Sequence, residues 1–266
     1  MQALNVALVQ GETRWHDAAA NREYYAGLVR SAPADSDLVV LPETFLTGFT
    51  NDTEDQSVPM DGEDVAWLRE LAREVDAVVT GSLVIVEDGR HFNRMFWMRP
   101  DGRFDTYDKR HLFRMADEHQ HFSGGRERLI VELKGWRICP LVCYDLRFPA
   151  WSRNRRNEAA GGGMDYDLLI YVANWPAPRR NAWRTLLRAR AVENLACCVG
   201  VNRVGRDGKG IDYAGDSGVF DARGDTVLEL DDRSQLASVR LDPEPMLALR
   251  RKFPAWMDAD EFTLHL

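Results

Sequence analysis

The chain has 266 residues, of which 45% are hydrophobic and 29% charged, a balance that suits one large domain spanning residues 1–266. Acidic residues outnumber basic ones by 42 to 34 and are spread along the chain, which argues against a nucleic acid as partner. The N-terminus shows no charged leader, and the longest apolar run, residues 168–173, is far shorter than the roughly 18 residues of a membrane helix. We therefore expect a soluble protein with no membrane partner.

Patterns typical of strands and of helices alternate through the first half of the chain. Residues 5–10 and 38–41 are short apolar runs that indicate buried strands. A helix is expected between them at 17–30, where apolar side chains recur every three or four residues, and another from about Asp61 to Glu74.

Two turns with glycine follow in the same half of the chain. Residues 87–90 separate apolar runs at 78–86 and 92–98, and residues 100–103 form a second turn signal. Two hairpin connections in succession predict antiparallel strands here, which a purely parallel sheet does not contain.

The second half of the chain continues the alternation. Apolar runs at 138–142, 168–173 and 197–201 predict buried strands, with a helix at 182–194 before the last of them. Gly161-Gly162-Gly163 is interpreted as a surface loop, because no Lys-Ser/Thr pair follows it. Two mixed sheets stacked face to face, with helices outside, would bury all these strands. The predicted fold is therefore an α/β four-layer α-β-β-α sandwich.

Cys143 and Glu43 each come directly after a predicted strand. A nucleophile at a sharp strand-to-helix turn is exposed, and the following backbone N–H, that of Tyr144, points into the same site. Partial burial of Glu43 would raise its pKa, so that it can accept and deliver protons near neutral pH. Each residue taken alone also has an ordinary, non-catalytic interpretation: Cys143 as a buried structural cysteine and Glu43 as a surface carboxylate.

Lys109 lies in a third segment of mixed polar and apolar residues, 104–113. If this segment continues as a strand, Lys109 shares one face with Tyr107 and His111. A solvated lysine is the ordinary interpretation. In a dry pocket, however, its ammonium would stabilise an oxyanion and help to form a neighbouring thiolate.

Three segments around these residues resemble the signature blocks of the nitrilase-like carbon–nitrogen hydrolases. They are Leu-Pro-Glu-Thr-Phe at 41–45, Tyr-Asp-Lys-Arg-His-Leu-Phe at 107–113 and Val-Cys-Tyr-Asp-Leu-Arg-Phe-Pro at 142–149. Blocks at 171–176, 188–194 and 200–205 extend the resemblance over nearly the whole chain. Residues 110–115 and 174–176 are most similar to the omega-amidases, which hydrolyse the terminal amide of keto-acid monoamides such as α-ketoglutaramate.

The resemblance implies an amidase that needs no cofactor and acts through a cysteine thioester. Glu43 would carry protons, Cys143 would attack the amide carbon, and Lys109 with the N–H of Tyr144 would hold the oxyanion. Glu118 corresponds to a second carboxylate of the superfamily, although Asp117 stands where many members have glycine. Members commonly dimerise, which implies a homodimer.

A keto-acid substrate carries a carboxylate, and Arg147 is the nearest candidate in sequence to pair with it. Phe45, Phe148 and Trp175 are candidates for the walls of the pocket. For these three residues and Arg147, a purely structural role in packing is an equally open alternative.

Other functions stay open. The same three residues can serve a different amide or an N-carbamoyl compound, and a catalytically inactive member can serve as a binding scaffold, although a scaffold needs none of the three. The pair His119 and His121 suggests a metal-dependent amidohydrolase as an alternative. No further His or Asp set completes a ligand sphere, so we expect no metal. Four cysteines, two of them adjacent, are too few for a disulfide scaffold and indicate a reducing, cytoplasmic compartment.

Overall fold

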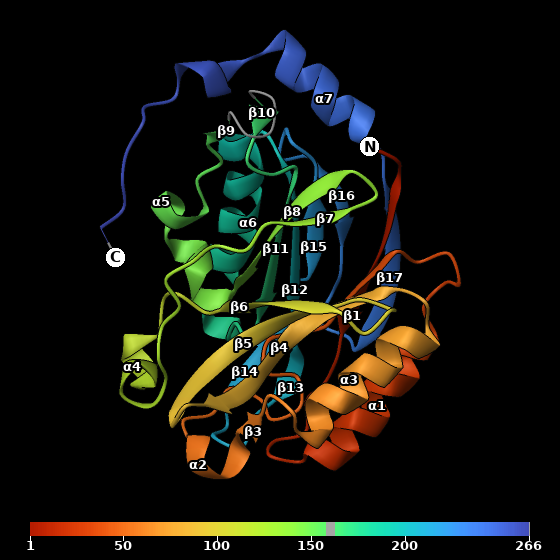
Figure 1. Cartoon of the computed structure of the whole chain (residues 1–266), viewed down its shortest axis with the longest axis vertical. Coiled ribbons are helices and arrows are strands. Elements are labelled where there is room, and N and C mark those ends of the chain that lie inside the picture. The colour runs from red at the N-terminus through yellow and green to blue at the C-terminus, as the bar shows by residue number, and fades with distance from the viewer. Residues whose placement is uncertain (158–162, 266) are drawn as a thin grey trace.

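The structure is a computed structural model that describes residues 1–157 and 163–265. Two large sheets lie at its centre (Figure 1). The first sheet runs in the order β17 (Gln235–Leu241), β1 (Leu4–Gln10), β2 (Leu38–Val40), β4 (Val78–Glu87), β5 (Arg90–Met98) and β6 (Phe104–Asp108), with β3 (Val58–Pro59) beside β4. The second runs in the order β16 (Thr226–Glu229), β15 (Gly218–Phe220), β12 (Cys197–Asn202), β11 (Leu168–Ala173), β8 (Trp136–Val142) and β7 (Val131–Leu133).

Both sheets are mixed, with parallel strands in the middle and antiparallel strands toward the edges. In the first sheet β1, β2 and β4 are parallel, and in the second β8, β11 and β12 are parallel. The two predicted hairpins are confirmed, because β5 pairs antiparallel with both β4 and β6. Parallel strands end at the same edge of a sheet, which gathers the residues that follow them.

Strand β1 shows how the layers form. Its side chains alternate, so Val6 and Leu8 belong to the core shared with the second sheet, whereas Ala7 and Val9 pack in a separate core with residues of α1 (Ala18–Arg30) and α3 (Glu63–Glu74). Both faces are therefore buried, which explains why the run is apolar without a polar alternation.

Helix α6 (Arg180–Asn194) packs against the second sheet. Gly200 of β12 leaves room for it, since a Cβ there would lie 2.4 Å from the side chain of Leu187 and 2.9 Å from that of Trp183. Figure 1 shows α1 and α3 side by side on one flank and α6 on another. The predicted α-β-β-α sandwich is confirmed.

The remaining elements are short or peripheral. They are α2 (Thr53–Gln56), α4 (Glu118–His121), α5 (Pro149–Ser152) and α7 (Pro243–Lys252), the paired strands β9 (Arg156–Asn157) with β10 (Gly163–Met164) and β13 (Val204–Arg206) with β14 (Asp212–Ala214), and the 3-10 turns η1 (Arg114–Ala116), η2 (Cys143–Arg147), η4 (Ala177–Arg179) and η5 (Ala255–Asp258). In the part of the chain that the structure describes, no helix is both long and apolar enough to cross a bilayer.

The predicted glycine loop and the predicted strand through Lys109 differ from the structure or lie partly outside it. Of the predicted glycine loop, Gly161 and Gly162 lie outside the described residues, and Gly163 begins β10. Strand β6 ends at Asp108, so the strand does not continue through Lys109 to His111. Lys109 lies in the bend that follows the strand, and its backbone N–H donates to Asn93 O.

Candidate active site

Glu43, Lys109 and Cys143 meet where strands of both sheets end. Glu43 follows β2 and Lys109 follows β6 in the first sheet, whereas Cys143 follows β8 in the second. Their exposed fractions are 0%, 1% and 9%, so all three residues are buried and Cys143 is the most exposed of them. The structure thus brings together three residues that the sequence separates widely.

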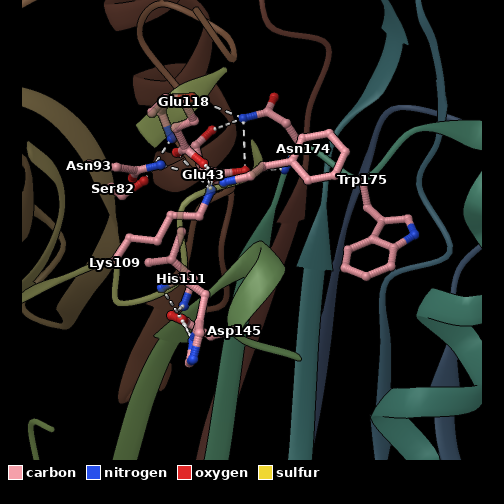
Figure 2. A network of polar contacts seen from close by, with 12 residues as sticks. Glu43, Ser82, Asn93, Lys109, His111, Glu118, Asp145, Asn174 and Trp175 are labelled. Atoms are coloured by element: carbon pink, nitrogen blue, oxygen red, sulfur yellow. Dashed lines mark hydrogen bonds and ion pairs between the residues drawn. The ribbon is translucent and has the colours of Figure 1, made fainter. Parts of the chain in front are cut away.

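Glu43 is held by donors on both carboxylate oxygens (Figure 2). Asn93 Nδ2 and Lys109 Nζ donate to Oε1 at 2.7 and 2.9 Å, and the backbone N–H of Asn174 donates to Oε2 at 2.7 Å. Asn174 Nδ2 also donates to the backbone oxygen of Glu43 at 2.9 Å. These contacts fix the position of the carboxylate beside the ammonium.

Lys109 lies between two carboxylates. Its Nζ is 2.9 Å from Glu43 Oε1 and 2.9 Å from each oxygen of Glu118, which also accepts from the backbone N–H of Phe113. Burial acts to lower the pKa of Lys109, but the carboxylates of Glu118 and Glu43 outweigh it and raise that pKa above its ordinary value. Burial raises the pKa of Glu118, and Lys109 opposes that shift. The lysine is therefore a fixed positive charge.

Cys143 is the first residue of η2 and has a φ of 44°, the left-handed region that residues with a Cβ rarely adopt. The predicted sharp turn between strand and helix is present. Burial raises the pKa of the Cys143 thiol well above its usual range, the Glu43 carboxylate adds to this shift, and Lys109 opposes it. The resting thiol is therefore protonated, so it must lose its proton to a base as it attacks.

A pocket opens above the thiol and holds about 500 Å³ of space, its open mouth included. Its lining includes Tyr144, Arg147 and Trp175, as expected, with the guanidinium of Arg147 4.9 Å from the centre of the Trp175 ring. The other lining residues are Phe49, Lys109, Phe113, Ala116, Cys143, Asn174, Pro176, Arg179, Ile211 and Tyr213. No acidic side chain is among them, so this wall of the pocket is cationic and apolar.

Two expected wall residues lie elsewhere. Phe45 is fully buried in the outer core, 5.5 Å from the ring of Tyr25 and 6.1 Å from that of Trp67, because the chain reverses at Thr44, whose φ is 38°. Phe148 stacks on His111 at 3.8 Å and meets the ring of Tyr144 edge-on at 5.1 Å. Phe45 is thus a packing residue, and Phe148 supports a wall residue without lining the pocket.

Several residues at the site carry no separate sequence signal. Asn93 lies inside a strand pattern, and Asn174 lies in a quoted block without an assigned role. Arg179 lines the pocket, whereas the adjacent Arg180 forms a two-point ion pair with Asp216. Two neighbouring arginines with such different surroundings cannot be told apart from the sequence.

His119 and His121 both lie on α4. Within residues 1–157 and 163–265, no group of three or more His, Cys, Asp or Glu side chains is placed to hold a metal ion.

Comparison with known proteins gives concordant results. The family model described as carbon-nitrogen hydrolase matches residues 5–251. The omega-amidase YafV of Escherichia coli (strain K12) is 44% identical over 268 residues, which cover 99% of this chain and 100% of that protein. A 2-oxoglutaramate amidase of Bacillus subtilis (strain 168) is 30% identical over 226 residues, 84% of this chain and 85% of that protein.

A solved structure agrees with these relatives. A CN-hydrolase superfamily protein from Xanthomonas campestris, which has an arsenic adduct in its active site, matches with a TM-score of 0.98 and 49% identity over 100% of both chains. The chain belongs to the carbon-nitrogen hydrolase family.

Proposed function

We propose that the chain is an omega-amidase-like hydrolase, which converts the terminal amide of a small carboxylate-bearing substrate, such as α-ketoglutaramate or α-ketosuccinamate, to the acid and ammonia. One observation carries the proposal: an ammonium fixed between two buried carboxylates lies at the base of a cationic pocket that exposes a single thiol. The names of the relatives, omega-amidase and 2-oxoglutaramate amidase, support the same substrate class.

In the first half of the reaction, Glu43 accepts the thiol proton while the sulfur of Cys143 attacks the amide carbon. The carbonyl oxygen gains negative charge, which the Lys109 ammonium and the backbone N–H of Tyr144 stabilise. Glu43 then donates its proton to the leaving nitrogen, and the C–N bond breaks to release ammonia. A thioester on Cys143 remains.

In the second half, Glu43 takes a proton from a water molecule that attacks the thioester carbon. The same oxyanion contacts apply, the C–S bond breaks to release the acid, and Glu43 returns its proton to the departing sulfur, which restores the thiol and the carboxylate. Glu118 keeps Lys109 in place and charged, because both its oxygens accept from the ammonium. No step needs a cofactor.

The far end of the substrate is assigned to two arginines. Arg147 and Arg179 line the pocket, and each guanidinium lies over an aromatic ring, that of Trp175 and that of Phe113. Among the described residues neither forms an ion pair with a carboxylate, so their N–H groups are available to the carboxylate of a substrate. A substrate with an ammonium group, such as glutamine, finds no acidic side chain in this lining.

Steady-state ammonia release tests the assignment on a panel of keto-acid amides, glutamine and N-carbamoyl compounds. We expect kcat/KM for α-ketoglutaramate to exceed that for glutamine at least about 100-fold, as expected for an uncompensated charge in a desolvated pocket. Arg179→Gln should raise KM for the keto-acid amide, whereas the control Arg180→Gln should not. Preference for an N-carbamoyl compound, or equal turnover of glutamine, would contradict the proposal.

We also propose a homodimer in the cytoplasm. The dimer is supported by the resemblance to a family whose members commonly dimerise. The compartment is supported by four free cysteines, which a reducing environment maintains. Light scattering of the purified chain tests the first proposal, and a monomer at micromolar concentration would exclude it.

A further inference from the structure

Asp145 is a fully buried carboxylate that the reaction does not use. It lies two residues after Cys143, and donors surround both of its oxygens (Figure 2). Tyr107 Oη donates to Oδ2 at 2.7 Å and the backbone N–H of Val142 donates to the same oxygen at 3.1 Å. The backbone N–H of His111 donates to Oδ1 at 2.9 Å, and His111 Nδ1 lies 2.8 Å from it.

These donors come from two segments that are attached to different sheets. Tyr107 and His111 flank Lys109 on either side of the bend that ends β6, whereas Val142 directly precedes Cys143 at the end of β8. Strands β6 and β8 belong to different sheets, so no ladder of backbone hydrogen bonds fixes one relative to the other. One carboxylate therefore joins the segment that carries the ammonium to the segment that carries the thiol.

The connection extends beyond Asp145. Tyr107 Oη also accepts from Trp151 Nε1 at 2.9 Å and from the backbone N–H of Arg110 at 3.3 Å. Burial, and then the charge of Asp145, raise the pKa of Tyr107 well above its usual range, so the phenol keeps the proton that it donates. The bend around Lys109 is thus held on both sides by groups that converge on one buried charge.

We propose that Asp145 is a positioning residue, which sets the separation between the Lys109 ammonium and the Cys143 thiol across the two sheets. This inference rests on the roles proposed above for those two residues. A misplacement of about 1 Å in such a site typically lowers the rate about 100-fold. Asp145 does not itself line the pocket, and its hydrogen bonds go to the segments around Lys109 and Cys143, so we expect its effect mainly on the chemical step.

The variant Asp145→Asn keeps the volume of the side chain and replaces one acceptor oxygen with a donor. Whichever way the amide turns, its NH₂ faces a backbone N–H, that of Val142 or that of His111. We expect kcat to fall at least about 100-fold while KM stays within threefold of the wild-type value.

Asp167→Asn is the matched control. Asp167 is 4% exposed and accepts from the backbone N–H of Arg137 at 3.0 Å and from Arg250 Nη1 at 2.6 Å. It directly precedes β11, at the end of the second sheet away from Cys143. Its loss should lower the urea midpoint about as much as the loss of Asp145, yet leave kcat within threefold. An equal fall of kcat in both variants would mean general destabilisation and would overturn the inference, as would a kcat within threefold in Asp145→Asn.

A second readout needs no substrate. Lys109 acts to lower the pKa of Cys143, so a displaced ammonium should shift the pH profile of Cys143 alkylation upward in Asp145→Asn and not in Asp167→Asn. If Asp145→Asn does not fold, Tyr107→Phe keeps the carboxylate, removes the phenol that donates to Asp145 and accepts from Trp151 Nε1 and Arg110 N–H, and should lower kcat about tenfold. An unshifted alkylation profile refutes the positioning role, whereas a shifted profile in a chain that hydrolyses no amide supports it and refutes only the proposed function.

Discussion

Removal of the Lys109 ammonium tests the electrostatics of the site directly. Lys109→Met keeps much of the apolar stem but leaves the carboxylates of Glu43 and Glu118, both fully buried, without their shared cation. Removing one partner of a buried ion pair costs about 3–5 kcal/mol, because the remaining charge is uncompensated. We expect this loss in the free energy of unfolding at pH 8, and a loss of at least about 10²–10³ in kcat from the missing oxyanion contact.

The stability loss should depend on pH with a defined sign. Burial already raises the pKa of Glu118 above its ordinary value of 4.5 although Lys109 opposes the shift, so removal of Lys109 raises it further. A carboxyl whose pKa is higher in the folded state binds more protons there than in the unfolded chain. Folding is then favoured as the pH falls toward 4.5, so the gap to the wild type should narrow from pH 8 to pH 5.

Urea unfolding at pH 5, 6, 7 and 8 measures this gap, and Lys134→Met provides the control. Lys134 Nζ is also 2.9 Å from both oxygens of a carboxylate, that of Asp37, but these side chains are 32% and 18% exposed. Such a pair contributes only about 0–1 kcal/mol. The reasoning is refuted if the two variants lose equal stability at pH 8, or if the gap for Lys109→Met stays constant with pH.

The remaining predictions concern the cysteines and a metal. Cys143→Ala should abolish ammonia release and keep the urea midpoint near the wild-type value, and residual turnover above about 1% would exclude Cys143 as the nucleophile. Brief, limiting iodoacetamide should label Cys143 before Cys139, Cys197 and Cys198, which are 0–4% exposed, and peptide mass mapping would contradict this if another cysteine reacts first. Because burial raises the pKa of Cys143, its labelling rate should still increase above pH 9, whereas a plateau near pH 7 would indicate a resting thiolate. Chelators should leave activity unchanged, and inactivation reversed by zinc would favour a metallohydrolase.

The fold was largely predictable because apolar runs report burial. The strands at 5–10, 138–142 and 168–173 are buried on both faces, so their patterns are continuous and end in polar residues at the edge of the sheet. A residue that closely follows an apolar run lies at that edge, which is why Cys143, after 138–142, and Glu43, after 38–41, could be assigned. Phe45 also follows the run at 38–41, but its side chain points to the outer core, since the left-handed Thr44 reverses the chain.

Contacts across the two sheets were not predictable. Asp145 lies in a recognised block, yet its partners Tyr107 and His111 are 38 and 34 residues away in sequence, and no local pattern connects them. Arg179 lines the pocket and Arg180 pairs with Asp216, a difference that depends on where residues far away in sequence lie. Side-chain partners of this kind depend on how separate sheets dock, which periodicity does not encode.

The left-handed backbone at Cys143 lowers the stability of the fold, although the reaction requires a cysteine at this position. A residue with a Cβ in this conformation costs about 1–2 kcal/mol, which glycine avoids, although glycine gives back about 0.5–1 kcal/mol through its freedom in the unfolded chain. Cys143→Gly would therefore leave the protein about as stable as before, and inactive. A directed-evolution campaign that selects for heat resistance alone has no means of retaining this cysteine, so each round needs a selection for turnover as well.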